Sequence, residues 1–223
     1  RTTTALPAAL VGPAVALYNG YLYVVGGLRP DGTPSAAVYS APIRSDGSLG
    51  AWTTAPNAYP EAVAFATAFG FGGNLYVLGG DPGTSTDPNA QGGAGTKSVR
   101  YARARNGAVG PWAVDEALIK QRKKHVHWIA FGQIIAAEGV YEGNPGSLEL
   151  ERTLVEADGT LAAWNGITSS ANQINANVYN AAAVVSPIRP ADAGPRFLLL
   201  GGQRFTLTPP GGLSDAVYVN VAP

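Results

Sequence analysis

The feature that most constrains this chain is a short sequence that occurs three times. DGSLGAW (46–52), NGAVGPW (106–112) and DGTLAAW (158–164) each begin with a turn dipeptide and end with a tryptophan. Asp-Gly and Asn-Gly favour hairpin turns, because both central residues of a type I′ turn need positive φ. Each copy therefore predicts a turn followed by an outer strand, whose indole packs on a neighbouring unit.

Three further β-rich segments recur in a fixed order before each copy. The first strand is expected within 13–18, 62–69, 125–131 and 178–185, the second within 21–27, 74–80, 134–139 and 196–202, and the third within 37–43, 98–104, 148–154 and 216–222. Glycines close the second segment, where they let the backbone turn and let units approach closely. The repeat unit is thus a four-stranded sheet of about 55 residues, present about four times.

A single sheet of this kind cannot bury both of its faces, so successive units must stack. Four-stranded units of this length predict a β-propeller. The glycine pair, the tyrosine of the third strand (Tyr39, Tyr101 and Tyr218) and the tryptophan together resemble the kelch repeat. The third unit departs from that pattern, because Glu138-Gly139 replaces the glycine pair and no tyrosine matches Tyr39.

The two ends of the chain are expected to meet. Residues 2–10 resemble 53–60, which follow the first tryptophan, whereas the strand at 216–222 has no fourth strand after it. We therefore predict an all-β propeller of four blades, each with four antiparallel strands, in one domain. Its blades lie at about 13–55, 62–115, 124–167 and 176–223, and residues 1–6 complete the last one. Kelch propellers usually have more blades, so a fragment of a larger ring is the alternative.

Composition excludes several classes of protein. Fifteen basic residues balance 15 acidic ones, and charged residues make up only 13% of the chain, so no field attracts nucleic acid or an anionic membrane. The absence of cysteine excludes disulfides and thiol chemistry, including that of the copper radical oxidases of the kelch type. No apolar segment approaches the length of a transmembrane span. The chain does not begin with methionine, so we expect a processed, exported protein, located extracellularly, at the cell surface or in the periplasm.

The densest polar segment leads into the first strand of the third unit. It supplies the candidate partner or ligand contacts Arg122, Lys123, Lys124, His125 and His127. The two histidines would point to the same side of a strand, where a metal site can begin. We expect them instead to be polar inner-strand residues that face the channel, and we predict no metal or cofactor.

A second candidate site is the loop at 81–95. Asp81, Asp87 and Asn89 carry oxygen ligands of the kind that bind Ca²⁺. The loop lacks the regular alternation and the closing glutamate of a dedicated calcium loop. We therefore predict a glycine-rich insertion without bound metal.

Long connections gather on one face of the predicted propeller, at 28–35, 81–97 and 203–214 and in the links between units. Long loops on a rigid scaffold commonly form binding sites. We therefore predict a non-enzymatic interaction or structural module that binds a protein partner through this face. The alternative is a carbohydrate-binding propeller that uses Tyr59, Trp128 and Phe205 as stacking surfaces, and a sugar-modifying enzyme is a further alternative.

Overall fold

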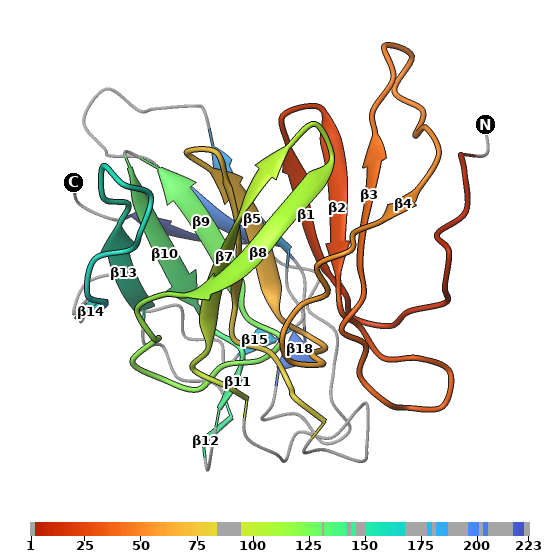
Figure 1. Ribbon diagram of the computed structural model, residues 1–223. Coiled ribbons are helices and arrows are strands. Elements are labelled where there is room, and N and C mark those ends of the chain that lie inside the picture. Colours follow the sequence, from red (N-terminus) through yellow and green to blue (C-terminus); the bar gives the residue numbers. More distant parts are fainter. Residues whose placement is uncertain are drawn as a thin grey trace.

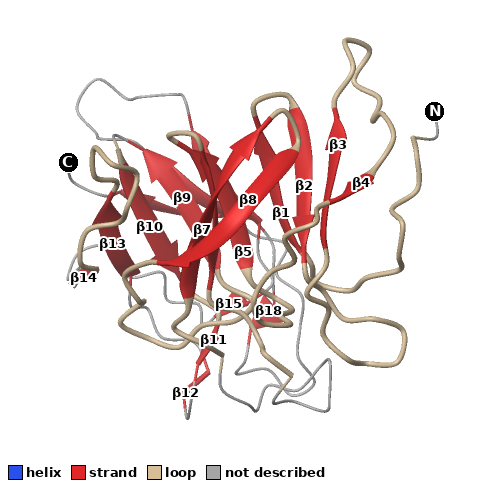
Figure 2. Cartoon of the chain, in the orientation of Figure 1, coloured by secondary structure: helices blue, strands red, loops and turns tan. Residues whose placement is uncertain are grey.

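The described chain is built from strands and loops, with no helix (Figure 2). The computed structural model describes residues 3–83, 95–130, 132–141, 144–145 and 150–167, followed by the strands at 178–179, 182–186, 196–200, 203–204 and 216–220. No helix in this described part is long and apolar enough to cross a membrane. The all-β class predicted from the sequence is confirmed.

Three four-stranded antiparallel sheets follow one another along the chain (Figure 1). The first contains β1 (Ala14–Tyr18), β2 (Tyr21–Val25), β3 (Val38–Pro42) and β4 (Thr53–Thr54). The second contains β5 (Thr67–Phe71), β6 (Asn74–Leu78), β7 (Val99–Arg105) and β8 (Ala108–Val114). The third contains β9 (Val126–Ala130), β10 (Gln133–Ala137), β13 (Leu150–Leu154) and β14 (Asn165–Ile167). Within each sheet, strands are neighbours in chain order, as the repeat predicted.

The remaining strands form smaller sheets. β16 (Ala182–Ser186), β17 (Arg196–Leu200) and β19 (Ala216–Asn220) make a three-stranded antiparallel sheet. β11 (Val140–Tyr141) pairs with β12 (Asn144–Pro145), and β15 (Val178–Tyr179) pairs with β18 (Gln203–Arg204). β16 lies beside β9, so the three-stranded sheet continues the series after the third sheet.

The turn dipeptides form two different turns. At Asn19-Gly20 and Asn106-Gly107 both residues have positive φ, between 45° and 81°, as a type I′ turn requires. At Asp46-Gly47 and Asp158-Gly159 only the glycine has positive φ. There the aspartate carboxylate accepts the backbone N–H of the residue two positions later, Ser48 or Thr160. The single turn type predicted from the sequence is therefore wrong at the Asp-Gly turns, where the side chain stabilises a wider turn.

This difference moves the start of the outer strand. β8 begins directly after its Asn-Gly turn and includes Trp112. In the first and third sheets the outer strand begins only after the tryptophan, at Thr53 and Asn165. The outer strand predicted to follow each turn therefore begins directly after the turn only in the second sheet.

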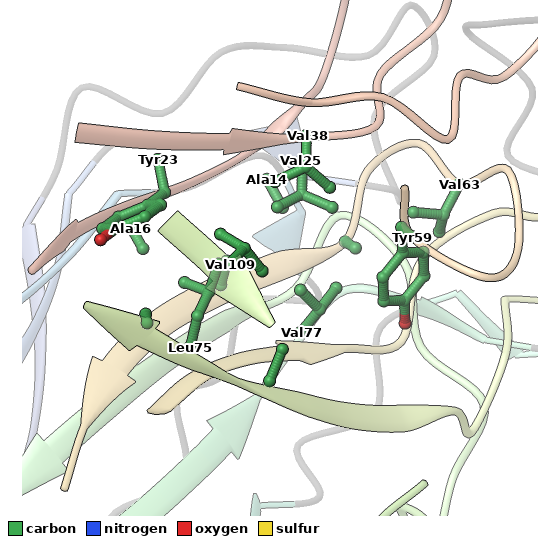
Figure 3. Close-up of a cluster of buried hydrophobic side chains, with 14 residues drawn as sticks. Ala14, Ala16, Tyr23, Val25, Val38, Tyr59, Val63, Leu75, Val77 and Val109 are labelled. Carbon is green, nitrogen blue, oxygen red and sulfur yellow. The ribbon is translucent and has the colours of Figure 1, made fainter. Parts of the chain in front are cut away.

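Neighbouring sheets pack through apolar faces. Tyr23, Val25 and Val38 of the first sheet are buried against Leu75, Val77 and Val109 of the second (Figure 3). The opposite face of the second sheet packs on the third, where Phe69 stacks on Tyr76 and the cluster includes Ile134 and Trp164. The second sheet is therefore covered on both faces, as stacking of repeated units requires.

Backbone hydrogen bonds join each sheet to the segment that begins the next one; we call this arrangement the joint. The Gly27 N–H donates to Val63 O at 2.8 Å, and the Gly80 N–H donates to Arg122 O at 2.7 Å. In return, the Val63 N–H donates to Ser35 O, and the Arg122 N–H donates to Thr96 O. The two joints thus use the same bonds at equivalent positions of the repeat.

A second set of bonds runs through residues with left-handed backbone. Gly12, Phe65 and Lys124 precede the first strands of successive sheets, and φ at each lies between 56° and 60°. The Phe65 N–H donates to Gly12 O, and the Lys124 N–H donates to Phe65 O. The Lys124 ammonium lies 4.8 Å from the centre of the Phe65 ring, a cation–π contact that favours this strained conformation.

The beginning of the described chain lies against the first sheet. The Leu49 N–H donates to Thr3 Oγ1, and the Trp52 indole N–H donates to Thr4 O at 3.1 Å. Residues 3–6 form no strand, and β19 pairs with β17 in the described sheet. Residues 1–2 and 221–223 lie outside the described residues, so closure of the last sheet by residues 1–6 stays a prediction.

The contacts of residues 3–4 follow from the position of this segment in the repeat. The Trp112 indole N–H donates to Asn57 O, and the Trp164 indole N–H donates to Glu116 O. Thr4 therefore occupies the position of Asn57 and Glu116, which belong to the links that follow an outer strand. These links supply acceptors for the tryptophan of the following unit.

The joint predicts a large effect of a methyl group at Gly26. A Cβ at this position would lie 2.1 Å from Val63 O, and φ is +67°. Gly20 is the matched control, because its φ is +77° and nothing lies within 4 Å of its Cβ position. Both Gly→Ala changes place a side chain at a residue with positive φ, which strains the backbone. Only in Gly26→Ala does the new methyl group also clash with Val63 O of the joint. We expect Gly26→Ala to lower the free energy of unfolding by about 1–3 kcal/mol more than Gly20→Ala.

Urea unfolding of the two variants measures this difference. Equal losses of stability would show that the close approach at the joint does not contribute.

Candidate functional site

The polar segment singled out in the sequence passes through the second joint, where it is buried. Arg122 is 1% exposed, and its guanidinium donates to Glu151 Oε1 from Nε at 2.9 Å and to Glu138 O from Nη1 at 2.9 Å. Glu151, on β13, also accepts the backbone N–H groups of Ile119 and Lys120. One carboxylate thus fixes both the arginine and the preceding link.

The next two residues are anchored to the second unit. Lys123 is also 1% exposed, and its ammonium donates to Asp81 Oδ2 at 2.8 Å. The Lys123 N–H and C=O pair with Val140, which belongs to the segment after β10. Lys124 is buried as well, over the Phe65 ring. These cations therefore stabilise contacts between sheets, where burial keeps them from an external acidic partner.

The two histidines face β5. His125 Nε2 lies 3.0 Å from Thr67 Oγ1, and the His127 ring lies 5.2 Å from the Phe69 ring. Burial lowers the pKa of His125 well below its usual value, and the nearby Arg122 charge lowers it further. Burial also lowers the pKa of His127, to about 4. Both side chains are therefore neutral near pH 7 and pack between the inner strands of two sheets.

The other predicted contact residues lie away from this cluster. Tyr59 is 2% exposed and packs edge-on against Trp112 with ring centres 5.0 Å apart, and burial raises the pKa of its hydroxyl to about 12. Trp128 is 2% exposed on β9. Neither ring offers a face to a sugar, so the stacking role predicted for them is not available in this structure. Phe205 lies outside the described residues.

The described residues bring no three metal-ligating side chains of the His, Cys, Asp or Glu type together. Asp81, which was considered as a calcium ligand, instead accepts from Lys123 and from the Gly83 N–H. Asp87 and Asn89 lie outside the described residues. The chemistry of the buried cluster is therefore that of ion pairing and hydrogen bonding between units.

Sequence reasoning missed the acidic partners of this cluster. Glu151 and Asp81 were not linked to the basic segment, because they are distant from it in sequence. One signal was present: Glu151 lies inside the expected third strand of the unit, LELERTL (148–154), and a buried strand carboxylate requires a cation.

The first sheet exposes an apolar row on its inner strand. Along β1, Ala14 and Ala16 face the second sheet and are buried, whereas Val15 and Leu17 point to the other side and are 49% and 68% exposed. Val11, which lies just before this strand, is also exposed. A strand that is apolar on both sides is typical of a sheet that is covered on both faces. The exposed row on β1 is therefore the clearest candidate contact surface in the described chain.

Comparison with known proteins does not assign a family: no protein-family model matches the chain, and no curated protein matches it.

The buried ion pair predicts a strong dependence of stability on Glu151. Replacing it with leucine leaves Arg122 charged and buried without its carboxylate, which costs about 3–5 kcal/mol. Glu156→Leu is the control, because Glu156 is exposed, and we expect a change within about 0.5 kcal/mol. Adding Arg122→Met to Glu151→Leu should recover part of the loss.

Chemical unfolding of the three variants tests this pair. If Glu151→Leu is no more destabilising than Glu156→Leu, the pair does not hold the joint together.

The histidines predict a loss of stability in mild acid. Both have folded pKa values below 6.5, so the unfolded chain binds protons in a range where the folded protein does not. Stability then falls as pH falls from about 6.5 toward 4, by at most about 1.4 kcal/mol per pH unit for each histidine. Part of His127 remains accessible, so we expect His125 to supply the larger share.

Unfolding free energies of the wild type, His125→Asn and His127→Gln between pH 7 and 4.5 measure this effect. The carboxylates are the same in all three proteins. Any decrease in the slope of unfolding free energy against pH in a variant is therefore due to the histidine that was replaced. An unchanged slope in both variants would contradict the prediction.

Proposed function

We propose that this chain is a non-enzymatic interaction and structural module that binds a protein partner within a larger assembly. We propose further that its sheets are kelch-like blades of a β-propeller. The repeated joints support the second proposal, because the same bonds relate each sheet to the next. The order of the inner strands agrees with it, since β1 lies beside β5 and β9 lies beside β16.

The observation that carries the functional proposal is the apolar row formed by Val15 and Leu17. The opposite side of the same strand is covered by the second sheet. In that contact, apolar side chains of a sheet face pack against β1. Burying Val15 and Leu17 contributes about 25 cal/mol for each Å² of apolar surface removed from water. We propose that the partner presents an apolar sheet face to this row.

The long-loop face predicted from the sequence is a second possible contact. Of its long loops, 28–35 is described, whereas most of 81–97 and 203–214 lies outside the described residues. A partner site on that face stays a prediction. Export from the cell also stays a prediction.

Replacing Leu17 with glutamate tests the proposal. Leu17 is 68% exposed, so a charge there should change the free energy of unfolding by no more than about 0.5 kcal/mol. Val114→Glu is the matched control, because Val114 is also exposed and apolar but lies on the outer strand β8. Cross-linking and affinity capture of the three proteins in the native extract, followed by mass spectrometry, should recover a partner with the wild type and Val114→Glu and lose it with Leu17→Glu.

Two outcomes contradict the proposal. Recovery of the same proteins by all three baits shows that the β1 row is not the contact. A large loss of stability in Leu17→Glu shows that the row is covered by the chain itself in solution, for example by the sheet of β16, β17 and β19.

A further inference from the structure

Three turns of the described chain share one set of hydrogen bonds. In the turns at 29–33, 44–48 and 156–160, the first N–H donates to the last C=O, and the glycine N–H donates to the first C=O. The aspartate of each turn also accepts the N–H and the hydroxyl of the serine or threonine that ends it. The turn at 29–33, RPDGT, therefore repeats the geometry of the other two, although it lies in the long loop between β2 and β3.

The carbonyl of a turn glycine is the group that the preceding sheet binds. Asn74 Nδ2 and Tyr76 Oη, on β6, donate to Gly159 O at 3.1 Å and 2.5 Å. Ser40 Oγ, on β3, donates to Gly107 O at 2.8 Å. In both interfaces between the three four-stranded sheets, polar donors on one sheet thus hold a turn of the next unit.

Strand register identifies the equivalent positions of the third sheet. β10 begins at Gln133 as β6 begins at Asn74, so Gln133 occupies the place of Asn74. The third residue of β2 pairs with Ser40, and the third residue of β10 pairs with Arg152. Arg152 therefore occupies the place of Ser40. The third sheet carries N–H donors where the first two sheets receive a turn.

A cleft of about 620 Å³ lies at these positions. Gln133 pairs with Leu154, and both lie on the face opposite to Ile134, which packs on the second sheet. The cleft therefore lies on the face of the third sheet that is directed away from the second. Its lining comes from β10, β13, β14 and the link between the last two: Gln133, Arg152, Thr153, Leu154, Ala162, Ala163, Asn165 and Gly166.

The turn at 29–33 is available for a contact. All five of its residues are exposed, and nothing lies within 4 Å of the Cβ position of Gly32. Among the described residues, the Asp31 carboxylate accepts hydrogen bonds only from Thr33 of the same turn. The turn at 44–48 is already engaged, because the N-terminal segment bonds to the residue that follows it.

The exposed turn and the cleft are complementary in chemistry. Gln133 can donate to Gly32 O, as its counterpart on β6 donates to Gly159 O. Arg152 carries the charge that complements the Asp31 carboxylate, and it makes no ion pair within the described part of the chain.

The turn cannot enter the cleft of its own molecule. The loop at 28–35 is fixed to the first sheet, because the Ser35 N–H donates to Gly27 O at 2.8 Å. The cleft lies on the far face of the third sheet, and the second sheet lies between them (Figure 1). A turn of this kind that fills the cleft must therefore come from another molecule.

We propose that the cleft over β13 and β14 binds the turn at 29–33 of a second copy of this chain. The contact is head-to-tail, because the turn and the cleft are different surfaces of the same molecule. The inference goes beyond the proposed function and uses a different surface from Val15 and Leu17. The two proposals can therefore fail separately.

A labelled cyclic peptide of residues 27–35, added to the full chain, tests the site by fluorescence anisotropy. Cyclisation suits this segment, because its two ends are hydrogen-bonded to each other in the structure. We expect saturable binding that is weakened about tenfold in Arg152→Ala and about threefold in Gln133→Ala, for the loss of a charged and a neutral hydrogen bond. Arg105→Ala is the matched control, because it removes the same charge from an exposed position on β7 and should leave binding unchanged.

A peptide with Asp31→Asn tests the charge pair separately from the turn. The asparagine oxygen can still accept the two hydrogen bonds from Thr33, so the turn is kept and the charge is lost. We expect about tenfold weaker binding to the wild type and no further weakening in Arg152→Ala. The Leu17→Glu protein should bind the unchanged peptide like the wild type, whatever happens to the partner of the proposed function.

Sedimentation of the full chain over a range of concentrations tests the occupant. We expect self-association that is lost in Arg152→Ala, which lacks the cleft donor, and in Gly32→Val, which cannot form the turn. Gly32 lies in an exposed loop, so the fold should be kept, and Asp31→Asn serves as a second turn variant. A mixture of Arg152→Ala and Gly32→Val should form a dimer with one copy of each, because one variant retains the turn and the other retains the cleft.

Three outcomes overturn the proposal. Absence of peptide binding, or equal binding to the wild type and both cleft variants, shows that the cleft is not a turn site. Peptide binding by a chain that stays monomeric at all concentrations shows that a second copy is not the occupant. Self-association that the mixture of the two variants does not restore shows that the contact is not head-to-tail.

Discussion

The structure depends on backbone hydrogen bonds that pass from one sheet to the next. At each joint the chain turns through left-handed residues, and the N–H and C=O groups that this turn frees pair with the neighbouring unit instead of with water. Because these bonds are made by the backbone, they fix the offset between sheets whatever the side chains are. The apolar faces then pack in a register that is already set.

Charged side chains in the polar segment at 120–127 also hold one sheet against the next. A lysine and an arginine buried at 1% exposure are costly unless paired, and here each meets a carboxylate from another part of the chain. The third unit lacks the first glycine of its pair, and Glu138 takes that position with φ of +60°. Arg122 donates to the carbonyl of this residue, so the ion-pair cluster stabilises the point where the repeat is least regular.

The sequence predicted the order of the strands, but it did not predict which side chains are paired in space. Hairpin dipeptides, paired glycines and recurrent apolar segments predicted the three four-stranded sheets, because each of these signals acts within a few residues. The burial of Arg122 and Lys123 was not predictable, since it depends on Glu151 and Asp81, which are close to them only in space. The exposed row on β1 was missed for a related reason: Val15 and Leu17 resemble core residues in sequence, and only the stacking direction decides which side is covered.

The contact between Thr4 and Trp52 repeats what Asn57 and Glu116 do for the later tryptophans. A whole repeat inserted ahead of the first sheet could therefore form the same indole-to-carbonyl contact with the first sheet that the existing repeats form with one another, without a change in the existing residues. Half a repeat would leave an indole without its acceptor. The contacts between units are therefore compatible with the insertion or deletion of whole units, and incompatible with fractions of a unit.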